Sequence, residues 1–304
     1  MAKKPISPLD DLDPQDSFVL QYFHRPKPGD ILYHYCSMQA FEAIVRSGKI
    51  RMSDINMMND FAEMTWGYSI FEEAASRLLQ EREKDSSLPD RAFFDAIDAE
   101  LAPANLYVHP LIACFSKNPD VLSQWRGYAA DGTGVCIGFD ATKLKQTAAT
   151  FLNCEYDFEV QVEQMKGRLT AAHSLRHEYT PSDHAMHLFG YLPSLKNPAF
   201  REEAEVRAVH LLTVKISNDG VELTDPGGEA FGRSVEGTSV EFGVRNNDVV
   251  AYVDTPYFDE MPDGTISEVV LGPKNPNGWT NVSAMLTRHG HKGVTIKASK
   301  ATYR

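Results

Sequence analysis

The sequence predicts an α+β fold in which several short strands form a sheet with helices around it. Strand-like apolar runs and helix-like amphipathic segments are interleaved along the chain, but the segments are short and many loops are long. That combination argues against a doubly wound parallel sheet, in which helices cross over regularly between strands. An apolar fraction of 42% and an aromatic fraction of 10% supply enough side chains for a substantial core.

The clearest local signals lie near the start of the chain. Asp30–Cys36 is rich in β-forming and aromatic residues and is predicted as a strand. Ser37 is a typical N-cap for the amphipathic helix Met38–Ser47, and Gly48 is placed to end that helix. Lys49–Ser53 is predicted as a second short strand.

Further along, apolar runs predict strands and amphipathic patterns predict helices. The predicted strands are Leu111–Ser116, Gly134–Phe139, Glu205–Val214, Ile266–Leu271 and Val294–Lys297. The predicted helices cover residues 61–100 with a break near Ser86–Pro89, then 120–129, Glu159–His177 and Asn281–His289.

The length of 304 residues suits one large domain or two ordinary ones. Residues 1–28 are rich in Pro and Asp and are predicted as a flexible N-terminal arm. Residues 29–304 are predicted as a single domain. A polar, Gly-rich stretch at about 217–247 predicts hairpins and loops inserted into that domain.

Composition and charge indicate which partners and which cellular location the protein is expected to have. The formal net charge of −12 argues against non-specific binding to nucleic acid, because phosphate repels an acidic surface. The sequence contains no apolar stretch of the length that a signal peptide or a membrane span needs. The four cysteines, at positions 36, 114, 136 and 154, form no CxxC pair, so we expect reduced thiols and a cytoplasmic location without membrane attachment.

Eight short sequence motifs follow one another along the chain in an order typical of a known family. The motifs are Leu32-Tyr-His-Tyr-Cys-Ser37, Asn59-Asp60 with Glu63, Cys114-Phe-Ser116, Gln124-Trp125 with Tyr128-Ala129, Gly134-Val-Cys-Ile-Gly-Phe-Asp140, Phe200-Arg-Glu-Glu-Ala-Glu-Val-Arg207, Val270-Leu-Gly-Pro273 and Tyr303-Arg304. As an ordered set, from about residue 30 to the C-terminus, they resemble a bacterial family called domain of unknown function 2971. The family name implies no activity.

Three residues also have the order of a known catalytic set. His34 lies in the first predicted strand, Tyr128 on a short helix after a later strand, and Glu205 at the start of a strand far downstream. This order is similar to that of ADP-ribosyltransferases of the His-Tyr-Glu kind, which include the diphtheria-toxin and poly-ADP-ribose polymerase groups. The resemblance implies an ADP-ribosyltransferase-like split, mixed β-sheet with peripheral helices, and it implies NAD as a substrate with no metal.

These residue types suit cleavage of the bond between nicotinamide and ribose. That cleavage develops positive charge on the ribose, and a fixed carboxylate such as Glu205 stabilises the charge. Tyr128 would form a platform for the flat nicotinamide ring. His34 would hydrogen-bond a ribose hydroxyl, and the backbone of Tyr35 would bind the carboxamide. If Glu203 and Glu205 lie on one strand, they share a face, and Glu203 would then engage the acceptor.

Ser37 and Trp125 complete the set of residues that we predict to contact NAD. Trp125 is also expected in the core, where it would form one wall of the cleft. Two positions depart from the pattern of the transferases. Tyr35 stands where that family commonly has Gly, and Arg207 shares the face of Glu205 and could neutralise it.

The leading hypothesis is an NAD-dependent ADP-ribosyltransferase that modifies a macromolecule, or an NAD glycohydrolase. The resemblance is compatible with a bacterial toxin or a phage-defence effector, with a neutralising antitoxin as its partner. The acidic charge favours a protein acceptor over a nucleic acid. The rival hypothesis is a non-catalytic module on the same scaffold that binds a nucleotide or a protein.

Other patterns receive structural interpretations. Asp60 with Glu63 fits a capping box at a loop-to-helix junction beside Asn59, with a contribution to the substrate rim as the alternative. The pairs His173 with His177 and His184 with His187 have spacings that could ligate a metal, which would suit a metal-dependent hydrolase, but no HExxH motif accompanies them.

Overall fold

The computed structural model of the protein describes residues 22–57, 63–144, 150–230, 233–245, 247–258 and 264–303. Its strands are β1 (Ile31–Cys36), β2 (Lys49–Asp54), β3 (Val108–Ser116), β4 (Val135–Asp140), β5 (Thr150–Asn153), β6 (Glu205–Ser217), β7 (Gly220–Thr224), β8 (Gly228–Ala230), β9 (Arg233–Val235), β10 (Glu241–Arg245), β11 (Asp248–Pro256), β12 (Ile266–Leu271) and β13 (Thr295–Ala298). Its helices are α1 (Met38–Ser47), α2 (Glu63–Arg82), α3 (Arg91–Leu101), α4 (Leu122–Tyr128), α5 (Ala141–Leu144), α6 (Phe158–Ser174), α7 (Pro181–Tyr191) and α8 (Trp279–Arg288), with 3₁₀ turns at Ile55–Met57, Ala104–Leu106, Leu192–Ser194 and Pro198–Glu203.

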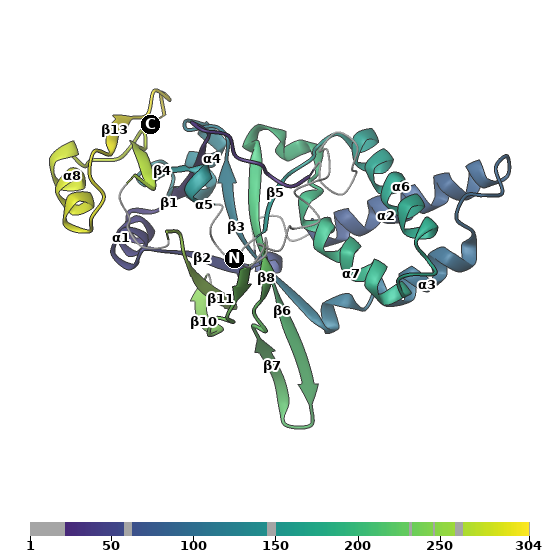
Figure 1. Cartoon of the computed structure of the whole chain (residues 1–304). Helices are drawn as coiled ribbons and strands as arrows, with labels where there is room; N and C mark the ends of the chain where they lie inside the picture. Colours follow the sequence, from purple (N-terminus) through teal and green to yellow (C-terminus); the bar gives the residue numbers. More distant parts are fainter. Residues whose placement is uncertain are drawn as a thin grey trace, which may run out of the picture.

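Among these elements, eleven strands form one open sheet, and β8 with β9 forms a separate hairpin (Figure 1). The main path of the sheet runs β10-β11-β2-β3-β1-β4-β12-β13, and β6 pairs with β3, β5 and β7 beside it. Neighbouring strands are antiparallel except for β12 and β13, which are parallel. The fold is therefore α+β with a mixed sheet and peripheral helices.

Strand β3 is the junction of the sheet. Along one edge it pairs with β6 over its whole length, from Val108 to Ser116. Along the other edge, β2 pairs with it at Leu111 and Ile112, and β1 pairs with it only at Ser116. Between these contacts, residues 113–115 have no registered partner on that edge among the described strands, so β1 and β2 leave a break in the sheet there.

Two hydrophobic clusters support this arrangement. One lies against the sheet and is covered by α1, α5 and α8, with Phe41, Phe139 and Tyr257 fully buried in it. The other joins α2, α3, α6 and α7, which gather at one side of the sheet (Figure 1), and it is centred on Ile70 and Ile97.

The elements around the break follow the predictions from sequence. The Ser37 side chain accepts a hydrogen bond from the backbone N–H of Ala40, and Gly48 ends α1 in the left-handed conformation. The predicted helix over residues 61–100 is two helices, α2 and α3, on either side of the predicted break. The sequence did not predict β5, α7 or β11, which are short or adjoin Gly- and Pro-rich segments.

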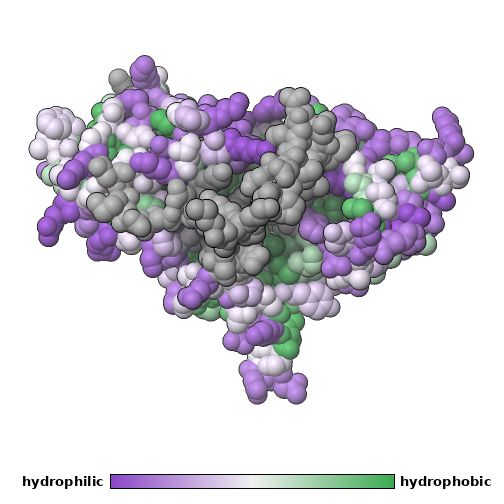
Figure 2. All heavy atoms as spheres, viewed as in Figure 1, coloured by the Kyte–Doolittle hydropathy of each residue, from purple (hydrophilic) through white to green (hydrophobic). Residues whose placement is uncertain are grey.

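The stretch predicted as an insertion at about 217–247 is largely extended where the structure describes it. It contains β7, β8, β9 and β10, and β6 continues to Ser217 instead of ending near Val214. The β6–β7 hairpin projects from the sheet, and apolar atoms lie along one side of it on an otherwise mainly hydrophilic face (Figure 2).

Part of the predicted N-terminal arm packs on the molecule. Residues 1–21 lie outside the described residues. Tyr22 stacks edge-on against Tyr191, and Phe23 forms an isolated bridge with Leu152. The packed chain thus begins before residue 29. Among the described residues, no helix combines the length and the apolar composition that crossing a bilayer requires.

Gly134 joins α4 to β4 where the chain passes closest to the first strand. A Cβ atom at this position would overlap the carbonyl oxygen of Cys36, the residue that precedes the cap of α1. Gly190 offers a contrast, because a Cβ atom there would meet nothing within 4 Å.

We therefore expect Gly134→Ala to lower the free energy of unfolding by about 1–3 kcal/mol, since overpacking forces the backbone to shift. Gly190→Ala, inside α7, should instead raise it by up to about 1 kcal/mol through helix propensity. Urea unfolding of both variants measures the difference. Equal behaviour of the two would contradict the close approach of β4 to Cys36.

Candidate functional site

A pocket of about 430 Å³ opens at the break in the sheet beside β3. Side chains and backbone from β1, β2, β3, α1, α4, β10 and the start of β6 surround it. The lining residues are His34, Tyr35, Cys36, Ser37, Ala40, Arg51, Ser53, Ile112, Ala113, Cys114, Phe115, Gln124, Tyr128, Ala130, Glu203, Glu205 and Arg245. Its volume lies within the range typical of small-molecule sites.

Most of the residues predicted from sequence line this one pocket. His34, Tyr35, Ser37, Tyr128 and both carboxylates come together there, although more than 170 residues separate the first from the last. The exception is Trp125, which is fully buried and does not line the pocket. Its Nε1–H donates to Asp120 Oδ1 at 2.6 Å.

His34 is held by the exposed edge of β3. Its Nδ1 lies 2.9 Å from the carbonyl oxygen of Cys114, in the gap between β2 and β1. A carbonyl only accepts, so Nδ1 carries the proton and donates. Burial lowers the pKa of His34, opposed by this hydrogen bond. The imidazole is therefore neutral near pH 7, and Nε2 is left as an acceptor.

Tyr128 and Glu203 form the next pair along the pocket. The Tyr128 hydroxyl donates to Glu203 Oε1 at 3.1 Å. Burial and the nearby charge of Glu203 raise the pKa of Tyr128, so its hydroxyl stays protonated. The other carboxylate oxygen of Glu203, Oε2, accepts from the ammonium group of Lys196.

Glu205 is enclosed by two cations. Arg207 donates from Nε to Oε1 at 2.9 Å and from Nη2 to Oε2 at 3.0 Å, while Lys196 Nζ donates to Oε2 at 2.5 Å. Burial would raise the pKa of Glu205, but the charges of Arg207 and Lys196 outweigh it and lower the pKa to about 2. The ion pair with Arg207 that the sequence offered as an alternative is therefore formed, and Glu205 is ionised.

Glu63 is the third carboxylate of this group. It accepts from Arg207 Nη2 through Oε1, and its Oε2 is buried without a hydrogen-bond partner. Burial raises the pKa of Glu63, and this outweighs the opposing charges of Arg207 and Lys196. The carboxylate of Glu63 turns to Arg207, and its predicted capping box with Asp60 stays a prediction. Asn59 and Asp60 lie outside the described residues.

We call Glu63, Lys196, Glu203, Glu205 and Arg207 the buried ion cluster. All five side chains are almost completely buried. Three carboxylates face two cations, so the cluster carries one formal negative charge when all are ionised and none when Glu63 is protonated. Its charge at the pocket therefore depends on Glu63.

Glu203 and Glu205 do not lie on the same strand, although their carboxylates are close together. Glu203 ends a 3₁₀ turn, Ala204 takes the left-handed conformation with φ of 44°, and β6 begins only at Glu205. The condition for a shared face, that one strand holds both residues, is therefore not met. Lys196 draws their carboxylates together instead. The signal for Lys196 in the sequence is weak, a lone lysine after the apolar segment 188–195.

Tyr35 lines the pocket beside His34. Its ring packs edge-to-face on Trp125 at a centroid distance of 4.9 Å. Its hydroxyl donates to the Asn118 carbonyl and accepts from the Val121 N–H. These contacts fix the ring of Tyr35 against α4, and Trp125 supports Tyr35 from outside the pocket.

The nearby thiols are poorly suited to nucleophilic chemistry. All four cysteines are free. Burial raises the pKa of Cys114 and of Cys154, which flank the buried ion cluster, so both thiols keep their protons. In the part of the chain that the structure describes, no group of three or more His, Cys, Asp and Glu residues is placed to hold a metal ion.

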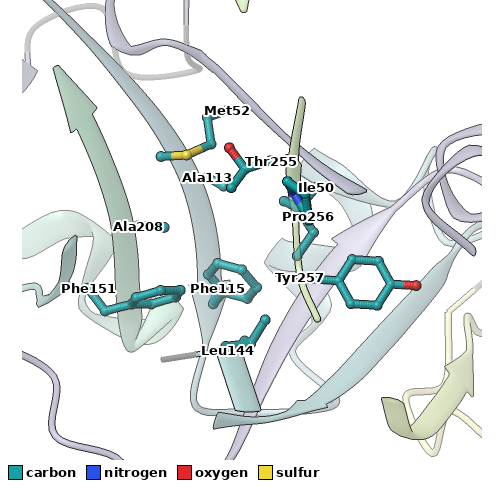
Figure 3. Close-up of a pocket in the computed structure, with 10 residues that line it drawn as sticks. All are labelled: Ile50, Met52, Ala113, Phe115, Leu144, Phe151, Ala208, Thr255, Pro256 and Tyr257. Carbon is teal, nitrogen blue, oxygen red and sulfur yellow. The ribbon is translucent and has the colours of Figure 1, made fainter. Parts of the chain in front are cut away.

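A second cavity, of about 20 Å³, lies among the core side chains (Figure 3). Its lining residues are Ile50, Met52, Ala113, Phe115, Leu144, Phe151, Ala208, Thr255, Pro256 and Tyr257. The space has room for about one water molecule and is almost wholly apolar. It is a packing gap of the core rather than a ligand site.

Fold and pocket together define an α+β protein whose mixed sheet is broken beside a buried ion cluster. A family model described as "Protein of unknown function (DUF2971)" matches residues 124–208, which is more than a quarter of the chain. This match supports the resemblance to that family noted from the sequence. It runs from α4 into β6 and so includes Tyr128 and four members of the buried ion cluster. No curated protein and no solved structure matches the chain.

The buried ion cluster generates a prediction about stability. Arg207→Met leaves Glu63 and Glu205 buried without their main cation, and breaking a buried ion pair costs about 3–5 kcal/mol. Arg46→Met is the matched control, because Arg46 pairs with Glu42 on the exposed face of α1 and such pairs contribute about 0–1 kcal/mol. Chemical unfolding of both variants measures these losses. A loss below about 1 kcal/mol for Arg207→Met would show that the cluster is not formed as described.

Proposed function

We propose that this pocket binds the nicotinamide riboside part of NAD and that the protein uses NAD as a substrate. It would transfer ADP-ribose to a macromolecule, with a protein favoured as acceptor, or hydrolyse NAD. The observation that carries the proposal is the convergence of His34, Tyr128, Glu203 and Glu205 on one pocket of suitable volume. The order of residues in the sequence selected His34, Tyr128 and Glu205 independently of their positions in space, and Glu203 was added because it lies two residues before Glu205.

The neutral state of His34 suits contact with a sugar. Nδ1 donates to the Cys114 carbonyl, so Nε2 presents a lone pair to the ligand. A ribose hydroxyl would donate to this nitrogen. Tyr128 is fixed by its bond to Glu203, and its ring would stack on the nicotinamide. The side-chain amide of Gln124, which also lines the pocket, could pair with the carboxamide.

The charge of the buried ion cluster supports the proposed bond cleavage. The bond from ribose C1′ to the nicotinamide nitrogen breaks, and its electron pair leaves with nicotinamide. The ribose then carries positive charge, which a preorganised negative site stabilises. Glu205 stays ionised beside the pocket. The acceptor nucleophile or water then bonds to C1′ and releases its proton to Glu203 or to solvent.

The mouth of the pocket has features that suit the diphosphate of NAD. Arg51 lines it from β2 and is oriented by two hydrogen bonds to Asp254 of 2.9 Å each and by stacking on Tyr252. The N-terminus of α1, at Ser37, also lines it, and helix N-termini favour anions.

A second candidate function is a nucleotide-binding module without catalysis. The specific observation in its favour is the bidentate bond from Arg207, which together with Lys196 occupies both oxygens of Glu205. A carboxylate neutralised in this way is a weaker electrostatic catalyst. On this hypothesis the same pocket binds NAD or ADP-ribose and releases nothing.

Nicotinamide release from NAD separates the two functions. We expect the protein to release nicotinamide and Glu205→Gln to slow that release about 10²-fold or more, because it removes the negative charge proposed to stabilise the cationic ribose. Glu202→Gln, on an exposed residue three positions earlier, should leave the rate unchanged. Circular dichroism and thermal unfolding check that each variant folds.

Thermal stabilisation of the protein by NAD without nicotinamide release would favour the binding module. If NAD gives neither stabilisation nor release, with or without a bacterial lysate as a source of acceptor, both candidates are contradicted.

The state of Glu63 predicts a pH dependence. The pKa of Glu63 is raised above the usual value of about 4.3, so the residue loses its proton only at higher pH. Its ionisation adds the negative charge that stabilises a cationic ribose. The value of kcat/KM should therefore rise with pH through this pKa. In Glu63→Gln, which stays neutral, the rising limb should disappear, and an unchanged limb would exclude Glu63 as its source.

A further inference from the structure

Strand β10 forms one end of the sheet. Among the described strands it pairs only with β11, so no other described strand lies along its outer edge. Two of its side chains, Phe242 and Val244, are 60% and 76% exposed, and Val249, opposite Val244 on β11, is 66% exposed. An edge strand with free backbone groups and exposed apolar side chains is a template for another strand.

The sequence of β10, Glu-Phe-Gly-Val-Arg, is complementary to itself when read antiparallel. With Gly243 at the centre, Glu241 lies opposite Arg245 of the partner subunit, and Phe242 lies opposite Val244 of the partner subunit. A two-fold axis produces each of these pairs twice. Opposite charges and aromatic–β-branched pairs across strands contribute about 0.2–1 kcal/mol each.

We infer that β10 is the interface of a two-fold dimer, in which two copies of the chain join their sheets through antiparallel β10 strands. Sliding the register by two residues places Glu241 opposite Gly243 and leaves the charges unmatched, so the centred register is the favoured one. Both charged side chains are exposed, and no ion pair of Arg245 with another described residue competes for it.

The interface reaches the mouth of the pocket. Arg245 lines the pocket described above. In the dimer, Glu241 of the partner subunit lies against Arg245, so each copy contributes a carboxylate to the pocket of the other. This inference rests on the edge strand and does not depend on the reaction proposed above.

The small area of the β10–β10 interface determines the affinity that we expect for the dimer. Stable interfaces bury about 1,600 Å² in total, and a pair of five-residue strands buries less. The dimer should therefore be weak and should form as concentration rises through the micromolar range.

Sedimentation velocity over a range of concentrations tests the inference. Wild-type protein should shift from monomer to dimer. Glu241→Arg and Arg245→Glu each place like charges opposite one another twice, so each should weaken the dimer about tenfold or more. An equimolar mixture of these two variants regenerates both ion pairs and should dimerise as the wild type does, as should the double variant Glu241→Arg/Arg245→Glu.

Two further variants serve as an additional test and as a control. Phe242→Lys removes the apolar pair and should also weaken the dimer. Ile216→Lys, at a position 63% exposed on the projecting hairpin, should leave it unchanged. Three results would each overturn the inference: monomer at every concentration, a dimer insensitive to the single charge reversals, or a mixture that stays monomeric. The first result would indicate that this edge pairs with a strand of another protein.

Discussion

Arg207 lies buried between Glu63 and Glu205, and Lys196 joins Glu205 to Glu203. Removing ionised groups from water is so unfavourable that each must find its partners in the fold. This requirement ties the first turn of α2 and the loop before β6 to one point. Because Tyr128 bonds to Glu203, the same cluster also fixes α4. The floor of the pocket thus has one geometry, determined by charge pairing rather than by apolar packing.

The break in the sheet determines where that floor becomes accessible. Strand β3 pairs along one edge with β6. On its other edge, the pairing with β2 ends at Ile112 of β3, and β1 pairs only with Ser116 of β3. His34 fills part of this gap by bonding to the Cys114 carbonyl. The backbone left without a strand partner thus receives a side-chain partner, and the imidazole gains a fixed tautomer. One irregularity of the sheet creates both the opening and the orientation of its first polar side chain.

Sequence patterns sufficed for the local elements and for much of the pocket. Ser37 and Gly48 define α1 through capping, which is a local property. The order of His34, Tyr128 and Glu205 along the sequence was enough to predict that they share one site. Lys196 could not be predicted, because its role depends on carboxylates that only the folded chain brings together. Glu203 and Glu205 would share a face only if one strand held both. The left-handed residue Ala204 instead separates Glu203 from β6, which begins at Glu205 as the apolar pattern predicts. Arg51 reaches the pocket only because β2 lies beside β3, a pairing that no short-range signal reveals.

The central claim is that NAD occupies the break beside β3, with its nicotinamide end over the buried ion cluster. A crystal structure of the protein with NAD or a hydrolysis-resistant analogue tests it most directly. We expect the nicotinamide ring to lie against Tyr128 and a ribose hydroxyl to lie within hydrogen-bond distance of His34 Nε2. A ligand bound elsewhere on the molecule, with this pocket left unoccupied, would contradict it.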